Sequence, residues 1–161
     1  GGKTGLYERG LESAIQIMQA TTTAAREMGE GKTPEEQLRV YVKTFVQRVV
    51  APGDTSWIHQ LMRHEISDPT PALDLVIDRV IRPRMEYLSG IVARLLRCRP
   101  EDPRAGLCAM SVHAQCMALM NSQIAERVDA RLRMTPKRLE DVAEHIVRFS
   151  LAGIQASATS P

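Results

Sequence analysis

The stretch that most constrains this chain is residues 71–97, PALDLVIDRVIRPRMEYLSGIVARLLR. Its apolar residues recur at alternating spacings of three and four, which predicts a helix with one wide apolar stripe. At about 1.5 Å per residue this helix would be roughly 40 Å long, the width of a small domain. Because only a layer of other helices can cover such a stripe, we interpret the stretch as the central column of an all-α domain.

Two residues within this stretch break its pattern. Pro83 has no backbone N–H and clashes with the preceding turn, which costs about 3 kcal/mol in a straight helix. We therefore expect a kink at residues 79–83, with a carbonyl group left free for another partner. Arg84 falls in phase with the apolar stripe, and two interpretations stay open. The guanidinium either reaches solvent or pairs with a structural glutamate, or it is a charged anchor in the wall of a ligand cavity.

Composition indicates one ordinary globular domain. A chain of 161 residues can bury a real core, and 25% charged residues with a net charge of +2 do not by themselves indicate nucleic acid or a membrane as partner. No apolar run is long enough to cross a bilayer. The three cysteines lack a disulfide-framework spacing, which favours a reducing cytoplasm. Eight methionines and 4% aromatic residues indicate a core that can reshape around different guests.

Capping residues divide the chain into six predicted helices. The first ends at Gly29 and Gly31. Thr, Asp or Ser ahead of an apolar-periodic run, often followed by Pro, predicts further helix starts at 33–36, 54–56, 70–71, 102–103 and 135–136. We expect residues 121–134 to be a loop or a frayed helical turn and 158–161 to be a tail. No alternating pattern predicts a strand.

Two of these helices are expected to need a second subunit. Between Leu107 and Met120 the chain carries no formally charged residue, and a helix that is apolar on nearly all sides must be covered on nearly all sides. Ala152, Gly153 and Ala156 near the end of the last helix are small enough for another helix to approach closely. We therefore expect a second subunit to help cover these helices.

The opening Gly-Lys-Thr-Gly-Leu-Tyr, residues 2–7, resembles the junction that follows the DNA-reading helix in TetR-family transcription regulators. The expected order of helices is similar to theirs: a linker helix, a short three-helix layer around a long column, and two final helices. The resemblance implies that these last two helices of each subunit form a four-helix interface in a homodimer. Residues 64–74, HEISDPTPALD, together with Arg-Pro-Arg at 82–84, resemble the C-terminal domain of the CecR-type branch. This resemblance covers nearly the whole chain.

The resemblance implies that residues 1–157 form an effector-binding and dimerisation domain, with residues 1–30 as its linker helix. The family's helix-turn-helix should lie before Gly1, so operator DNA would be contacted only through that part. The implied protein is a cytoplasmic regulator, usually a repressor, whose linker helix tilts between two states. Its implied partners are a second copy of the chain and an amphipathic or drug-like small molecule, with no membrane and no cofactor.

The resemblance also places a ligand site among the short helix after residue 56, the column and the helix after residue 103. The predicted ligand-binding residues are His59, Met62, Arg63, Arg84, Tyr87, Met110, His113 and Met117. Helical spacing supports a shared face for His59 with Met62, and for Met110 with His113 and Met117. The predicted dimer-interface residues are Leu107, Ala114, Ala118, Leu139, Val142, Ile146, Phe149 and Gly153.

Two other functions stay open. One is a helical protein-interaction module without a small-molecule site. The other is a metal or thiol sensor in which Cys98, Cys108, His113 and Cys116 come together. Because the chain has no CxxC or HxxxH spacing, we predict no metal site. We predict no enzyme either, since no phosphate-binding loop, nucleophile elbow or spaced carboxylate pair is present.

Overall fold

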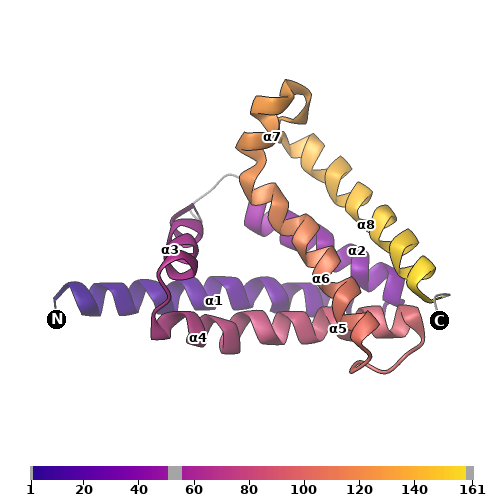
Figure 1. Ribbon diagram of the computed structural model, residues 1–161, viewed down its shortest axis with the longest axis horizontal. Helices are drawn as coiled ribbons and strands as arrows, with labels where there is room; N and C mark the ends of the chain where they lie inside the picture. The colour runs from indigo at the N-terminus through magenta and orange to yellow at the C-terminus, as the bar shows by residue number, and fades with distance from the viewer. Residues whose placement is uncertain (1, 51–55, 159–161) are drawn as a thin grey trace.

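The computed structural model describes residues 2–50 and 56–158, and every regular element within them is helical (Figure 1). No strand occurs in these two ranges, which confirms the all-α prediction. The helices are α1 (Lys3–Gly29), α2 (Pro34–Phe45), α3 (Ser56–Ser67), α4 (Pro71–Val76), α5 (Arg82–Leu96), α6 (Pro103–Ala118), α7 (Ser122–Val128) and α8 (Pro136–Ala158). None of the described helices is both long enough and apolar enough to cross a membrane.

The predicted central column consists of α4, a π-helical turn at Ile77–Ile81, and α5. Pro83 lies in the first turn of α5, where its missing N–H removes the donor that the carbonyl of Arg79 would have four residues on. That carbonyl accepts a hydrogen bond from Gln19 Nε2 of α1, at 3.0 Å. The carbonyl that was expected to be free for another partner is thus bonded to α1, and the irregular turn lies at Ile77–Ile81, whereas the kink itself stays a prediction. The irregular turn serves as an attachment point for α1.

Four helix starts follow the predicted caps, at Thr33, Thr70, Asp102 and Thr135, whereas the cap predicted at 54–55 lies outside the described residues. Thr33 and Glu36 form a reciprocal capping box, in which each side chain accepts a hydrogen bond from the backbone N–H of the other residue, at 3.3 and 2.9 Å. Asp102 accepts a hydrogen bond from the Arg104 N–H at the start of α6. Gly31, just past α1, has φ of +71°, a conformation that favours glycine. Each of these capping or turn residues lies within four residues of the helix end that it defines.

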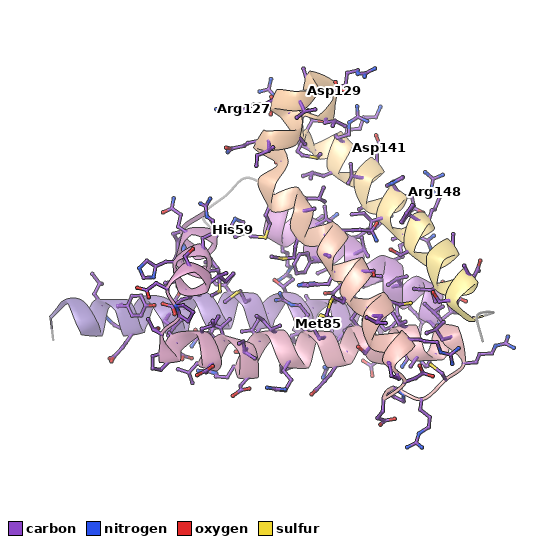
Figure 2. All side chains as sticks on the ribbon, viewed as in Figure 1. His59, Met85, Arg127, Asp129, Asp141 and Arg148 are labelled. Carbon is purple, nitrogen blue, oxygen red and sulfur yellow. The ribbon has the colours of Figure 1, made fainter. Side chains whose placement is uncertain are left out.

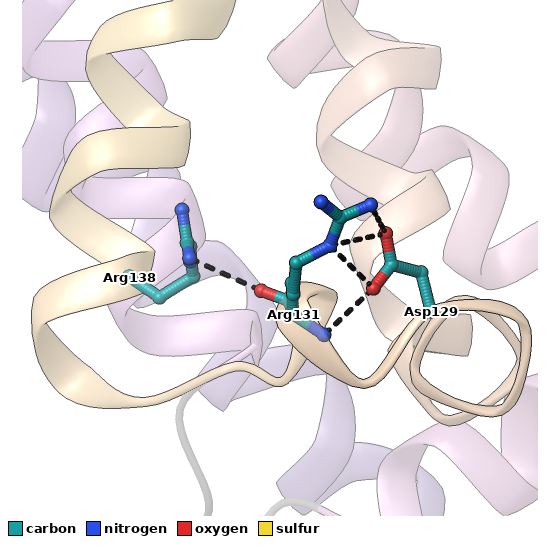
Figure 3. Close-up of polar contacts among 3 residues, drawn as sticks. All are labelled: Asp129, Arg131 and Arg138. Carbon is teal, nitrogen blue, oxygen red and sulfur yellow. Dashed lines mark hydrogen bonds and ion pairs between the residues drawn. The ribbon is translucent and has the colours of Figure 1, made fainter.

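The prediction for residues 121–134 is wrong in part, because Ser122–Val128 is a regular helix, α7. A short 3₁₀ turn follows, in which the Asp129 carboxylate accepts hydrogen bonds from the backbone and side chain of Arg131 (Figure 3). Arg138 of α8 donates a hydrogen bond to the Arg131 carbonyl at 3.1 Å. None of the described α7 residues is buried, so α7 has no apolar stripe that sequence periodicity could detect. With α4 and α5 counted as the one predicted column, the described residues form seven helices and not six.

The helices enclose two separate apolar cores. The larger lies among α2, α5, α6 and α8 and includes Tyr41, Phe45 and Ile91. The smaller lies between α1 and the first half of the column, and its buried members are Leu11, Ile15, Ala72, Val76 and Val80. In Figure 1, α1 runs beside the column, and α3 and α6 rise from the same side of this pair. The space under α3 and α6, where the two cores meet, is the part of the fold relevant to binding.

Candidate functional site

A cavity of about 150 Å³ lies where the smaller core meets α3 and α6. Four elements contribute most of its wall: α1, α3, the column and the second half of α6. Most of the lining side chains are aliphatic or methionine. The lining residues are Ile17, Met18, Thr21, Arg48, Ile58, His59, Met62, Ile66, Leu73, Val76, Val80, Ile81, Arg84, His113, Met117 and Met120.

The structure brings five of the eight predicted ligand-binding residues to this cavity. His59 and Met62 come from α3, Arg84 from α5, and His113 and Met117 from α6. Figure 2 shows His59 on α3, on the side of that helix toward α6.

The other three predicted residues lie elsewhere. Arg63 is exposed on α3, and Met110 is 62% exposed on α6. Tyr87 lies further along α5, where its hydroxyl donates a hydrogen bond to the Ala25 carbonyl of α1. The ring of Tyr87 also packs under the guanidinium of Arg26. These contacts attach the C-terminal part of α1 to the column.

Sequence reasoning missed the contribution of α1 to the cavity. Ile17, Met18 and Thr21 line it, and Arg48 reaches it from the π-helical turn Val46–Val50 that extends α2. The four-residue spacing of Ile17 and Thr21 is the only sequence signal for this face of α1, and a single pair does not define a face. The linker helix is thus itself part of the cavity wall.

Among the described lining residues, Arg84 is the charged one that is buried, with 6% of its surface exposed. Its Nε donates a hydrogen bond to Thr22 Oγ1 at 3.1 Å, and Nη2 donates one to the Met18 carbonyl at 2.8 Å. The guanidinium also lies 5.1 Å from the centre of the Phe45 ring. Within the described residues no carboxylate forms an ion pair with it. Arg84 therefore neither reaches solvent nor pairs with a structural glutamate, and the described contacts leave its charge without a counter-ion.

His113 closes the cavity on the α6 side as a neutral imidazole. Its Nδ1 lies 3.1 Å from the Tyr41 hydroxyl, and its ring meets the Phe45 ring edge-on at 5.2 Å. Burial, together with the nearby charge of Arg84, lowers the pKa of His113 from 6.5 to about 4. Burial likewise lowers the pKa of His59 on the opposite wall. Both imidazoles are therefore uncharged near neutral pH.

The depressed pKa of His113 predicts acid sensitivity in a defined window. Between pH 6.5 and about 4 the unfolded chain binds a proton at this residue and the folded chain does not, so the folded state is progressively destabilised as the pH falls. The full contribution is about 3 kcal/mol. In urea unfolding at a series of pH values, His113→Gln should show a shallower decline across this window than the wild type. The exposed His145→Gln should follow the wild type, and equal slopes for all three proteins would contradict the assignment.

Glu65 joins the cavity helix α3 to the start of α1, although Glu65 is not itself one of the lining residues. The Tyr7 hydroxyl of α1 donates a hydrogen bond to Oε1, and the Thr70 hydroxyl and N–H donate to Oε2 at 2.7 and 3.3 Å. Burial by itself would raise the pKa of Glu65, but these hydrogen bonds outweigh it and hold the pKa below its ordinary value. Glu65 is therefore ionised and fully buried, with acceptor oxygens that are already engaged.

The predicted dimer-interface residues fall into two groups. Leu107, Ala114 and Ala118 of α6 and Phe149 and Gly153 of α8 are exposed, with Leu107 and Phe149 at 64% and 63%. Leu139 and Ile146 are instead buried in the larger core of their own chain, and Val142 is half-buried against that core. Leu139 and Ile146 therefore offer little surface to a second subunit, and the interface as a whole stays a prediction.

The three cysteines do not form a metal centre with other side chains in the described residues, where no cluster of three or more metal-ligating groups occurs. Cys116 is buried, and this burial raises the pKa of its thiol to about 12. A thiol with that pKa stays protonated and is a poor metal ligand.

The fold defines a class of protein: an all-α domain in which a long N-terminal helix packs beside an interrupted central column. A model of the family described as "HTH-type transcriptional dual regulator CecR, C-terminal domain" matches residues 34–154. This match covers more than half of the chain, and the chain therefore belongs to that family, a C-terminal domain of TetR-type transcription regulators. The family is one of regulator domains and not of enzymes. A search of curated proteins finds no match.

Proposed function

We propose that this chain is the effector-binding and homodimerisation domain of a cytoplasmic, small-molecule-responsive transcription regulator. The regulator is a repressor that an effector releases from DNA. The observation that carries the proposal is the cavity of about 150 Å³, because its wall includes both the linker helix α1 and the irregular part of the column. A molecule in this cavity touches the helix whose tilt would change the spacing of the DNA-reading parts in a dimer.

Polar contacts give α1 a defined position against the wall. Tyr7 is bonded to Glu65 near the start of α1, Glu12 forms a two-bond ion pair with Arg79 at 2.7 and 2.9 Å, and Arg84 is bonded to Met18 and Thr22. Each contact reaches α3 or the column, which also carry cavity residues. An effector that moves either element by a fraction of a turn would change these contacts, and thereby shift a two-state equilibrium of α1.

Ligand binding is testable with Trp57, the only tryptophan, which lies next to the lining residue Ile58 on α3. We expect a saturable change in its fluorescence with members of a panel of amphipathic dyes and drug-like compounds. Val76→Phe puts a larger side chain into the cavity wall and should abolish the response. Leu75→Phe, at an exposed neighbouring position, should keep it. Thermal melting of both variants checks that they fold.

The second candidate is a helical protein-interaction module without a small-molecule site. Exposed apolar residues on α6 and α7 favour it, namely Leu107, Met110, Ile124 and Val128. Silence of Trp57 across the whole panel, or an unchanged response in Val76→Phe, would contradict the effector site and leave this alternative.

A further inference from the structure

We infer that the cavity binds an amphipathic organic anion, whose carboxylate, sulfonate or phosphate group is held by Arg84 while its apolar part fills the remaining space. This inference rests on the proposed effector site and adds the charge and shape of the effector. It starts from the charges of the wall. Two guanidinium groups, those of Arg84 and Arg48, belong to it, and the described lining residues include no aspartate or glutamate.

The buried guanidinium of Arg84 is positioned but not neutralised. Thr22 Oγ1 and the Met18 carbonyl are uncharged acceptors, and they engage two of the five N–H donors of an arginine. The Phe45 ring covers one face of the guanidinium plane. A guanidinium does not lose its proton in a protein, so the charge persists despite burial. An anion that enters the cavity would supply the missing counter-charge, and the planar fork suits an oxyanion with two oxygens.

Two carboxylates on helices that line the cavity, Glu65 of α3 and Glu12 of α1, are engaged elsewhere. Glu65 receives Tyr7 and Thr70, and Glu12 receives both terminal nitrogens of Arg79. Neither residue belongs to the cavity wall. The two wall histidines, His59 and His113, are uncharged near neutral pH, so they neither repel a cation nor attract an anion. The arginines therefore set the sign of the ligand, and a cationic ligand would face only like charge.

The rest of the cavity wall is apolar and would contact the apolar part of the ligand. Val76, Val80, Ile58 and Met62 present hydrocarbon and thioether surface, and a volume of about 150 Å³ suits one small ring or a short chain. Since Arg84 is bonded to α1 through Met18 and Thr22, an oxyanion that drew its guanidinium inward would pull on or release the linker helix. Anion recognition and the tilt of α1 would thus involve the same side chain.

The test compares three probes that share a ring and differ in charge: benzoate, benzyl alcohol and benzylamine, titrated near neutral pH and followed by Trp57 fluorescence and amide chemical shifts. Benzoate should bind about tenfold or more tightly than benzyl alcohol, because hydrogen bonds to a charged group are stronger than neutral ones. Benzylamine, a cation at this pH, should bind most weakly. Arg84→Met should remove the preference for benzoate and keep the affinity for benzyl alcohol.

Arg82→Met is the matched control, since Arg82 is an exposed arginine two positions away that lies outside the cavity. It should keep the wild-type preference. Benzyl alcohol binding as well as benzoate to the wild type would overturn the anion inference and leave the effector site standing, and this comparison needs no variant to fold. Binding of none of the three probes to the wild type would overturn both. A preference for benzoate that survives in Arg84→Met would show that Arg84 is not the anchor.

Discussion

Phe149→Asp should convert the chain from a dimer to a monomer. Phe149 is 63% exposed on α8, stacks on His145 of the same helix, and lies on the surface that we propose pairs with a second subunit. In a two-fold symmetric interface each substitution occurs twice, so two unpaired carboxylates would be buried. Burying an unpaired charge costs several kcal/mol, which weakens dimerisation by about a hundredfold or more. Sedimentation of the wild type and the variant at micromolar concentration measures the effect.

Leu75→Asp is the control for this experiment. Leu75 is also a large apolar residue with about half of its surface exposed, but it lies on α4, away from α6 and α8. It should stay dimeric. Circular dichroism should show unchanged helix content for Phe149→Asp, because the residue contributes little to the core of its own chain. A variant that remains a dimer would remove Phe149 from the interface, and a monomeric wild type would contradict dimerisation through this domain.

Local features of the fold were predictable because their causes are local. Pro83 has no N–H, so the carbonyl of Arg79 loses the donor four residues on, whatever surrounds the helix. In the structure Gln19 Nε2 donates a hydrogen bond to this carbonyl. The Thr33 capping box needs only four residues. In contrast, none of the described α7 residues is buried, and the 3₁₀ turn after α7 depends on the contacts of Asp129 with Arg131, so apolar periodicity could detect neither.

The sequence predicted which residues share a face of one helix, but not how the helices rotate and cross to bring those faces to the candidate site. Spacing places Met110, His113 and Met117 on one face of α6, but α6 crosses the column so that only its second half reaches the cavity. Met110 therefore ends up exposed. Tyr87 likewise follows Arg84 by three positions and lies next to the end of α1 instead. Crossing angles depend on the packing of whole helices, which no short motif encodes.

The same reasoning explains why two residues predicted for the interface are buried within their own chain. α8 has an apolar stripe wider than its own core requires, and the sequence does not say which edge of that stripe is left over. Leu139 and Ile146 lie in the middle and are buried by α2 and α6, whereas Phe149 and Gly153 lie at the outer edge. The role of Glu65 was also hidden, because its partner Tyr7 is 58 positions away.

Glu65→Ala should destabilise the chain by about 2 kcal/mol, because it removes three hydrogen bonds to a fully buried carboxylate and leaves their donors without that acceptor. Tyr7→Phe, which removes one donor at a partly exposed site, should cost about 1 kcal/mol. Urea unfolding measures both. Glu8→Ala, at an exposed position of α1, is the control, and its free energy of unfolding should stay within about 0.5 kcal/mol of the wild-type value.

The Tyr7–Glu65 hydrogen bond should also limit local opening of α1. Since Tyr7 lies in the second turn of α1 and Glu65 at the end of α3, loss of the contact should let the first turns of α1 open more often. Hydrogen exchange at residues 5–10 should then accelerate in Glu65→Ala and Tyr7→Phe, while α5 keeps its protection. In the double variant the two costs should sum to more than the measured effect, because the contact is lost only once. Additive costs with unchanged exchange would mean that α3 and α1 are not coupled through this hydrogen bond, and that an effector under α3 must reach the linker helix through Arg79 or Arg84.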